Sequence, residues 1–291
     1  MSFPRPVTYP YASLEDFLTA NALSVDSPLN DGANATFPVK AREIQATVLF
    51  ADIRSFSSRT RDLSPVETLI FVNHFFAWMN AEALRGKPGI IDKYIGDEVM
   101  VVYSREFGSE DPFVDAVQTA RRMGQNDSYG FAPHIGIASG PVAVGYVGTP
   151  LKYNCSVFGA PVALAARCAG IPPQTAATVS TAITFPASEW EDRDFDAVVP
   201  PIRYVMPDGT AEEGPVTWEL LEPTAVQMKN LPDTPVRQIV NRAFHLPSAS
   251  PEQRAKAGLR LLREKNRYWP KESPSRPRPD IDREPKVETD R

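Results

Sequence analysis

The sequence predicts an α+β fold in which helices flank a largely antiparallel sheet. Residues 45–53 (QATVLFADI) form an apolar, β-branched run that is typical of a buried strand and ends in an acid. Residues 65–85 show the apolar spacing of a long amphipathic helix. The short apolar runs 90–95 and 98–103 flank a Gly-Asp pair and indicate a hairpin. The order strand, helix, hairpin, helix, hairpin, helix along the chain favours one sheet with helices packed against it.

The remaining elements are predicted from local signals. Residues 13–22 are expected to form a short helix with Ser13 as its N-cap, and Pro65 suits the first turn of the long helix. Two more helices are expected in the middle of the chain, at 112–124 and 160–169. We further expect a strand pair around Gly140, with strands at 133–139 and 141–147, and a short strand at 217–221. Two helices are expected late in the chain, at 234–245 and 251–267.

Proline content divides the chain. The 29 prolines are about a tenth of the 291 residues, roughly twice the usual share, and they are sparsest in the long middle segment. We therefore expect an N-terminal extension with a short helix at 1–44 and a folded domain at 45–222. A C-terminal helical extension is expected at 223–269 and a disordered tail at 270–291.

Composition excludes several function classes. The net charge of −5 argues against a protein that coats nucleic acid, and we interpret the basic segment 252–267 as a solvated helix. The sequence has no apolar leader and no apolar run of about 18 residues, so we expect a cytoplasmic protein with no membrane partner. The two cysteines, Cys155 and Cys168, are expected to be free thiols.

The first candidate site is the end of the 45–53 strand. Asp52 follows the apolar run directly, and small polar residues come next. A carboxylate there suits a divalent cation, and the backbone N–H groups that follow would face phosphate oxygens. A helix-capping aspartate is the alternative, and this segment alone does not decide between the two.

Two more segments carry candidate residues. Asp97 follows Gly96 in the predicted hairpin turn, where an ordinary Gly-Asp turn is the simpler interpretation of that segment taken alone. Neighbouring strands could nevertheless bring Asp97 beside Asp52, and two carboxylates that share two cations are the arrangement of two-metal phosphoryl chemistry. Arg167 lies two turns into the helix that Gly159 opens, and it would be either a phosphate clamp or a plain surface arginine.

Together these segments resemble the catalytic domain of the class III nucleotidyl cyclases. The resemblance covers about residues 45–222 and rests on four motifs: FADIRSF, KYIGDEVM, IGIASGPVAVGYVG, and SVFG followed by AAR. It implies the class III cyclase fold with a ferredoxin-like core. It also implies cyclisation of a nucleoside triphosphate to a 3′,5′-cyclic nucleotide and diphosphate.

The resemblance assigns the catalytic roles residue by residue. Asp52 and Asp97, helped by the carbonyl of Ile53, would bind two divalent cations, Mn²⁺ or Mg²⁺. Arg167 would stabilise charge on the α-phosphate, and Arg203 would be a second clamp on the triphosphate. In this family the site forms between two protomers of a head-to-tail dimer, so one chain carrying both halves implies a homodimer with two equivalent sites.

The resemblance also assigns the substrate contacts. Lys93 and Ser156 would read the edge of the base. The backbone of five consecutive residues would hold the triphosphate: Ile53, Arg54, Ser55, Phe56 and Ser57. Three apolar side chains would line the base pocket: Phe50, Ile95 and Phe158. One departure is Ala163, which stands where the family usually has an asparagine that orients the ribose.

The base itself is left open by hydrogen-bond logic. Guanylate cyclases have an acid at the position of Lys93, which disfavours GTP, whereas Lys93 with a hydroxyl at Ser156 permits adenine, uracil or cytosine. Tyr94, the missing ribose asparagine and the compact chain resemble the pyrimidine cyclases of Pycsar antiphage systems, which implies UTP over CTP. Their cyclic product acts on a separate effector. The alternatives are an adenylate cyclase and a catalytically inactive, cyclase-like nucleotide-binding module.

Overall fold

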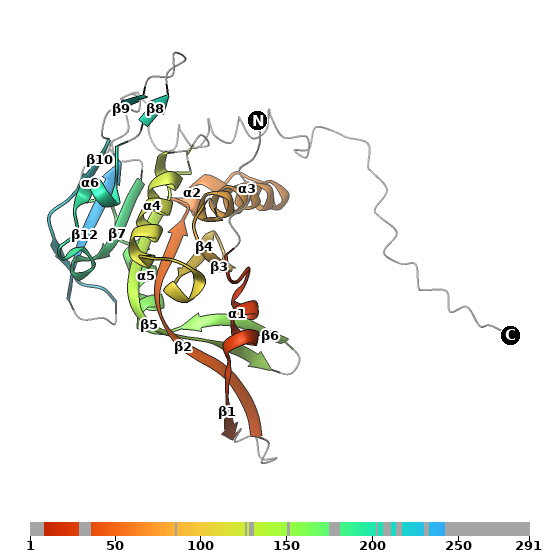
Figure 1. The fold of residues 1–291 in the computed structure, drawn as a ribbon. Coiled ribbons are helices and arrows are strands. Elements are labelled where there is room, and N and C mark those ends of the chain that lie inside the picture. The colour runs from red at the N-terminus through yellow and green to blue at the C-terminus, as the bar shows by residue number, and fades with distance from the viewer. Residues whose placement is uncertain are drawn as a thin grey trace.

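The computed structural model describes residues 9–28, 36–84, 86–125, 127, 131–149, 152–174, 181–201, 203–205, 211–213, 217–229 and 233–241. A mostly antiparallel sheet runs through the molecule, and helices cover both of its faces (Figure 1). The predicted fold class is therefore confirmed. Nowhere in the described part of the chain is a helix both long enough and apolar enough to cross a bilayer.

The strands of the main sheet are β1 Leu23–Pro28, β2 Thr36–Asp52, β3 Ile90–Ile95, β4 Glu98–Tyr103, β5 His134–Thr149, β6 Lys152–Phe158, β7 Thr181–Pro186, β10 Trp218–Leu220, β11 Thr224–Val226 and β12 Thr234–Asn241. Their order is β10-β12-β7-β5-β2-β4-β3, with β1 beside β2, β6 beside β5 and β11 beside β12. Strands β5 and β7 run parallel, and the other pairs are antiparallel. Strands β8 (Arg203–Val205) and β9 (Ala211–Glu213) form a second, two-stranded sheet.

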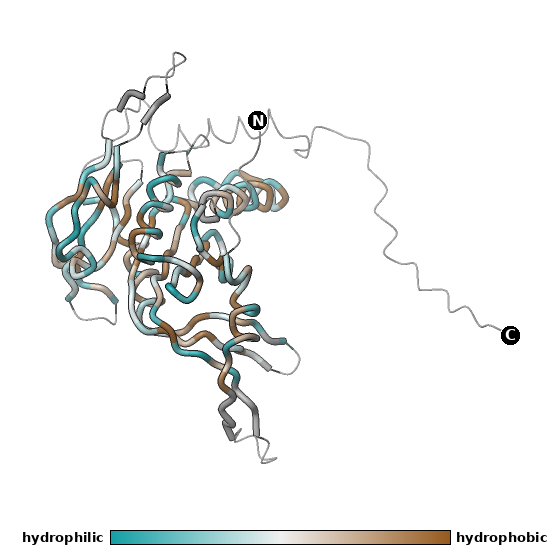
Figure 2. Tube along the Cα trace, viewed as in Figure 1, coloured by the Kyte–Doolittle hydropathy of each residue, from teal (hydrophilic) through white to brown (hydrophobic). Residues whose placement is uncertain are grey.

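Two hydrophobic layers hold the helices against the main sheet. The helices are α1 Leu14–Asn21, α2 Phe56–Thr60, α3 Pro65–Leu84, α4 Pro112–Gln125, α5 Ala160–Ala169 and α6 Phe195–Val198, with 3₁₀ turns η1 Arg105–Phe107 and η2 Ala187–Trp190. Helices α3 and α4 contribute to one core cluster, and α1 and α5 contribute to the other. Hydrophobic residues recur along these helices and the strands between them (Figure 2).

Strand β2 lies between the two layers, and its sequence shows why. Leu49 and Ala51 point into the cluster of α3 and α4, whereas Val48 and Phe50 point into the cluster of α1 and α5. A strand that is buried on both faces carries a continuous apolar run instead of an alternating one. The predicted strand at 45–53 is therefore confirmed as the second half of a longer one.

Local signals also fix the helix starts. The Ser13 hydroxyl accepts a hydrogen bond from the backbone N–H of Asp16 at 3.0 Å, as expected of an N-cap. Before α3, Ser64 and Glu67 form a reciprocal capping box, in which Glu67 Oε2 accepts from the Ser64 N–H at 2.9 Å. The predicted hairpin at 90–95 and 98–103 is confirmed with the same bounds.

Two glycines allow α5 to lie close to the sheet. Gly159 precedes the helix with φ at 158°, and a Cβ there would meet the Pro141 carbonyl oxygen at 2.8 Å. A Cβ on Gly136 of β5 would lie 2.0 Å from the Ala165 carbonyl oxygen and 2.2 Å from the Ala169 nitrogen. Only glycine at these positions fits the observed contact between α5 and β5.

Two predicted elements are wrong. The strand pair around Gly140 is one continuous strand, β5, because its pairing with β2 runs unbroken from Asp52↔His134 to Ala41↔Gly145. The segment predicted as a helix from residue 234 forms β12, which pairs with β7 and buries Val236, Ile239 and Val240. Sheet pairing overrides the helical spacing of these apolar residues.

The four-segment division of the chain stays a prediction. The described sheet includes β1, the start of β2 and β12, so its strands extend beyond 45–222 on both sides. The predicted helix at 251–267 and the tail at 270–291 lie outside the described residues.

Candidate functional site

Two acids meet at one end of the sheet. Asp52 ends β2, and Asp97 lies in the turn between β3 and β4. The antiparallel pairing of β2 with β4 sets Asp52 opposite Glu98, directly beside this turn. The Asp52 and Asp97 carboxyl groups consequently lie within hydrogen-bonding reach of each other. The expectation that neighbouring strands bring them together is confirmed.

The electrostatics of this pair are unfavourable for two negative charges. Burial, hydrogen bonding to Asp97 and the charges of Asp97 and Glu98 raise the pKa of Asp52 to about 8. Burial and the charge of Asp97 also raise the pKa of Glu98. Binding of either a proton or a cation reduces the repulsion between these carboxylates, and a cation can in addition be coordinated by them.

The residues fit a cation that shares its shell with substrate. Among the described residues, no group of three or more His, Cys, Asp or Glu side chains is arranged to hold a metal ion. Mg²⁺ is commonly held by one or two carboxylates together with substrate phosphates, so two aspartates and a carbonyl are a sufficient protein contribution. The carbonyl of Ile53 accepts from the Phe56 N–H at 3.2 Å and keeps a second lone pair.

The chain turns sharply after Asp52. Ser55 adopts a left-handed conformation with φ at 56°, and its carbonyl accepts from the N–H groups of Ser58 and Arg59, which begins α2. The ring of Phe56 stacks against Phe71 of α3 at 6.5 Å, so its side chain faces the core. Any contact of Phe56 with a phosphate would therefore use its backbone. Ser55 and Ser57 are exposed.

His134 is a neighbour of the acid pair that the sequence analysis missed. It lies directly opposite Asp52 on β5. Burial and the nearby charge of Arg54 lower the pKa of His134 to about 4, so its imidazole is neutral at pH 7. Its Nε2 atom is buried and has no hydrogen-bond partner within the part of the chain that the structure describes. The periodic pattern of the strand gave no signal for this residue, because only pairing with β2 places it at the site.

A second cluster joins the residues expected to read the base. Lys93 of β3 and Ser156 of β6 both contact Asp92, which the sequence analysis missed. Ser156 Oγ lies 2.8 Å from Asp92 Oδ2, and Lys93 Nζ lies 3.3 Å from the same oxygen. Lys93 Nζ also lies 5.7 Å from the ring centroid of Phe158. The only sequence signal for Asp92 is an acid inside an apolar strand.

Apolar side chains around this cluster differ in exposure. Ile95 is 47% exposed and Phe158 is 44% exposed, which leaves both available to a ligand or a partner. Phe50 is only 2% exposed and packs in the core shared with α1 and α5. The expectation that Phe50 lines an open pocket is therefore not supported by its burial. Tyr94 packs on Phe76 of α3, at 4.2 Å between ring centroids.

The predicted phosphate clamps lie on other elements. Arg167 is exposed on α5, one helical turn after the exposed Ala163. Arg203 begins β8, whose partner is β9 in the separate sheet. The structure therefore does not bring the strand of Arg203 into the sheet that carries Asp52.

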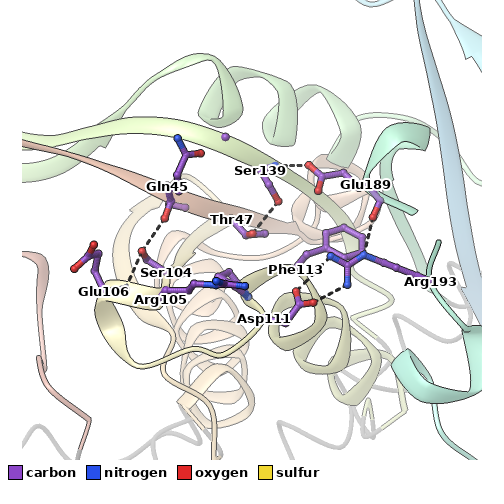
Figure 3. Close-up of a pocket in the computed structure, with 13 residues that line it drawn as sticks. Gln45, Thr47, Ser104, Arg105, Glu106, Asp111, Phe113, Ser139, Glu189 and Arg193 are labelled. Atoms are coloured by element: carbon purple, nitrogen blue, oxygen red, sulfur yellow. Dashed lines mark hydrogen bonds and ion pairs between the residues drawn. The ribbon is translucent and has the colours of Figure 1, made fainter. Parts of the chain in front are cut away.

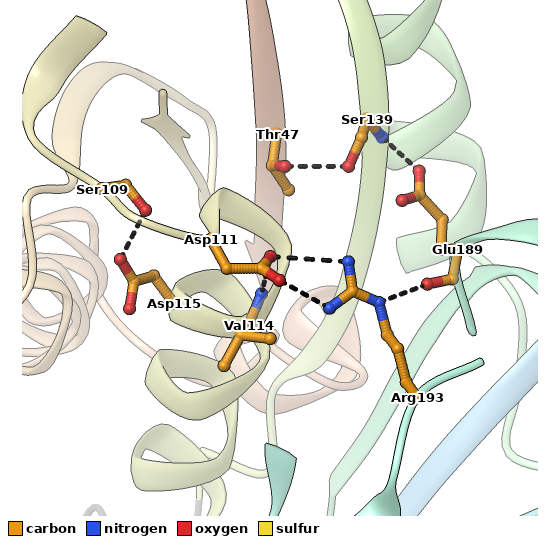
Figure 4. A network of polar contacts seen from close by, with 8 residues as sticks. All are labelled: Thr47, Ser109, Asp111, Val114, Asp115, Ser139, Glu189 and Arg193. Atoms are coloured by element: carbon orange, nitrogen blue, oxygen red, sulfur yellow. Dashed lines mark hydrogen bonds and ion pairs between the residues drawn. The ribbon is translucent and has the colours of Figure 1, made fainter. Parts of the chain in front are cut away.

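A polar cavity of about 460 Å³ lies elsewhere on the sheet (Figure 3). It surrounds Thr47, five residues before Asp52 on β2, which at about 3.3 Å per residue is roughly 16 Å away. Arg193 Nη1 pairs with Asp111 at 2.7 Å, and its Nε donates to the Glu189 carbonyl at 2.9 Å (Figure 4). Arg193 and Asp111 thus tie the segment after η2 to the residue before α4, and the residues that line the cavity do not include the acid pair.

Comparison with known sequences adds a family match. The model of the adenylate and guanylate cyclase catalytic domain matches residues 39–188. The chain is 29% identical over 174 residues to an adenylate cyclase of Anabaena cylindrica, covering 56% of this chain and 34% of that protein. It is also 29% identical over 130 residues to a terminal-differentiation-specific adenylate cyclase of Dictyostelium discoideum, covering 42% of this chain and 6% of that protein. The chain thus spans a minor part of these relatives.

Solved structures show the same fold. The adenylyl cyclase CyaB from P. aeruginosa superposes with a TM-score of 0.52 at 18% identity, covering 71% of this chain and 98% of that one. A bacterial light-regulated adenylyl cyclase gives the same TM-score at 20% identity, covering 81% of this chain and 60% of that one.

Proposed function

Because the chain belongs to the family of adenylate and guanylate cyclase catalytic domains, we propose that it is a nucleotidyl cyclase. The reaction converts a nucleoside triphosphate to a 3′,5′-cyclic nucleotide and diphosphate. A bond forms between the ribose 3′ oxygen and the α-phosphorus, the bond to the β-phosphate oxygen breaks, and the 3′-hydroxyl proton is lost. The observation that carries this proposal is the contact between Asp52 and Asp97, two acids that disfavour each other's charge in the absence of a cation.

The acid pair has a defined part in this proposal. Asp52, Asp97 and the Ile53 carbonyl hold two divalent cations, Mn²⁺ or Mg²⁺. When bound, the cations supply positive charge that favours ionisation of the 3′-hydroxyl and departure of diphosphate. The backbone from Ile53 to Ser57 holds the triphosphate, and Arg167 offsets charge that develops on the α-phosphate. Arg203 remains a proposed second clamp.

The base is read at the second cluster. Lys93 donates a hydrogen bond to the base, and the exposed faces of Ile95 and Phe158 cover the ring. Ser156 is only 2% exposed in the single chain, so its proposed polar contact would be made by its hydroxyl oxygen at the floor of the site. We propose a pyrimidine nucleotide, UTP before CTP, on the sequence resemblance described above. ATP is the second candidate, because the two curated relatives are named adenylate cyclases.

The complete site is proposed to form between two copies of the chain. The acid pair and the base-reading cluster share no residue, and exposed apolar side chains stand beside the base-reading cluster. Arg167 is exposed on α5 and available to the acid pair of a partner protomer. A head-to-tail homodimer then contains two equivalent sites. We also propose, from the resemblance alone, that the cyclic product acts on a separate effector in the cytoplasm during antiphage defence.

The test is a product assay with all four nucleotides. Purified full-length protein is incubated with Mn²⁺ and UTP, CTP, ATP or GTP, and the cyclic product and diphosphate are quantified. We expect cyclic UMP as the main product. Cyclic AMP as the main product would support the second candidate and reject the pyrimidine assignment. Binding of triphosphates without any product would support the inactive module instead.

The shared site has its own test by complementation. Asp52→Asn and Arg167→Ala each remove one half of the proposed site. Mixing the two inactive variants regenerates one complete site in each mixed dimer, so activity should return to about a quarter of the wild-type level when half of the dimers are mixed. Activity that stays at the level of the separate variants would contradict sharing of the site.

A further inference from the structure

Asp92 is a buried acid on an irregular part of β3. Strand β3 pairs regularly with β4, except between Ile91 and Lys93, where the register shifts. A bulge of this kind re-aims the side chain of its extra residue. The Asp92 side chain is completely enclosed, whereas that of the adjacent Lys93 is 36% exposed. The bulge therefore places the Asp92 carboxylate in the interior, next to Lys93, the residue proposed to bind the base.

The contacts of Asp92 fix the direction of a hydrogen bond. The pKa of Asp92 is raised overall, because burial outweighs the hydrogen bond from Ser156 and the charge of Lys93, which both lower it. Ser156 Oγ donates its single hydroxyl proton to Asp92 Oδ2 at 2.8 Å, and Lys93 Nζ, 3.3 Å from the same oxygen, favours the ionised carboxylate, which only accepts hydrogen bonds. Ser156 then keeps only acceptor lone pairs for any other partner. Lys93, which lies 3.3 Å from Asp92, keeps free N–H donors.

The environment of the other carboxylate oxygen, Oδ1, shows that fold stability does not explain why an aspartate stands at position 92. Asp92 Oδ1 is buried and has no hydrogen-bond partner among the described residues. A buried acceptor without a partner is unfavourable, and an apolar residue in this apolar strand would avoid the cost. The role of Asp92 is therefore more readily explained by its contacts with Ser156 and Lys93 than by a contribution to stability.

We propose that Asp92 is a positioning residue for base selection, which fixes Ser156 as an acceptor and holds Lys93 as the neighbouring donor. The site then selects a base that turns an N–H group to Ser156 and an acceptor to Lys93. Cytosine and adenine do so with an exocyclic amino group and a ring nitrogen acceptor (N4–H₂ with N3, N6–H₂ with N1), whereas uracil and guanine do so with a ring N–H and an exocyclic carbonyl (N3–H with O4, N1–H with O6). The two classes of base present donor and acceptor in opposite order along their edge, so fixed positions of Ser156 and Lys93 favour one class over the other. The inference rests on the proposed function, because it assigns Lys93 and Ser156 to the base.

The decisive variant is Asp92→Asn. An asparagine amide can donate to Ser156, which frees the serine hydroxyl to donate toward a base carbonyl. Selectivity between the two classes of base should therefore relax, and the ratio of kcat/KM for the preferred nucleotide over nucleotides of the other class should fall about tenfold or more. The change should lie mainly in KM, since Asp92 is not proposed to touch the reacting atoms.

The chain offers a matched control in Asp115 of α4. Asp115 also accepts from a serine, since Ser109 Oγ lies 2.5 Å from one of its oxygens (Figure 4). It pairs with a lysine as well, since Lys87 Nζ lies 2.5 Å from the other oxygen. Asp115→Asn should lower the melting temperature and leave the nucleotide selectivity unchanged. Ser156→Ala should lose selectivity as Asp92→Asn does.

The experiment measures kcat and KM for the four nucleotides with Mn²⁺, and their dissociation constants in Ca²⁺, for the wild type and the three variants. Relaxed selectivity in Asp92→Asn but not in Asp115→Asn supports the inference. Unchanged selectivity in Asp92→Asn, or an equal change in Asp115→Asn, overturns it. A wild type that binds nucleotides selectively but forms no product contradicts the proposed reaction, while its dissociation constants still decide the role of Asp92.

Discussion

Gly136→Ala tests whether close packing of α5 on the sheet supports the site. A Cβ on residue 136 would lie 2.0 Å from the Ala165 carbonyl oxygen, whereas real Cβ contacts are essentially never under 3.0 Å. The atoms in the way belong to helix backbone, so α5 must move from β5 by at least about 1 Å. Overpacking of this kind costs about 3 kcal/mol, and at about 2–4 °C per kcal/mol the melting temperature should fall by about 6–12 °C.

The same displacement should reduce activity below what the loss of stability explains. Arg167 lies on α5, and a shift of about 1 Å in a positioning element can lower a rate about 100-fold. The assay combines thermal unfolding with cyclisation rates well below the melting temperature. Gly170→Ala is the control, because its Cβ would meet nothing closer than 3.5 Å. A Gly136→Ala protein with wild-type melting temperature and activity would refute the close contact of α5 with β5.

Two further predictions concern cations and the polar network. The raised pKa of Asp52 means that the folded, cation-free protein loses stability as the pH rises from about 4 to about 8. Mn²⁺ should therefore raise the melting temperature more at pH 8 than at pH 5, and Asp52→Asn should abolish this difference in a thermal-shift titration. Arg193→Lys should cost about 1 kcal/mol in chemical denaturation without changing cyclisation, because lysine loses the contacts to Asp111 and the Glu189 carbonyl. Since Arg193 lowers the pKa of Asp111, this difference should shrink as the pH falls below about 4, and a constant difference would speak against the ion pair.

Much of the fold could be predicted because local patterns and burial agree. The apolar run before Asp52 is a strand buried on both faces, and the Gly96–Asp97 turn joins two strands at the expected residues. Gly140 shows where this reasoning ends. A glycine with a positive φ usually marks a turn, but β5 continues through it because β2 supplies an unbroken partner. Only tertiary pairing decides between these outcomes.

The site could be predicted where residues follow strand ends and not where they depend on register. Asp52 and Asp97 carry the signal of an acid after an apolar run, and the structure brings them together. Asp92 contacts Ser156 from a bulge in β3, and His134 lies opposite Asp52 only through the pairing of β2 with β5. Single-sequence periodicity contains neither feature.

The most direct test of the central claim is the cyclisation rate of Asp52→Asn relative to the wild type. Losing one of the two proposed metal carboxylates should lower the rate about 10³-fold or more. The cation-free melting temperature at pH 8 should stay the same or rise, because an unfavourable buried charge is removed. An Asp52→Asn protein that forms cyclic nucleotide within tenfold of the wild-type rate would contradict the two-aspartate mechanism.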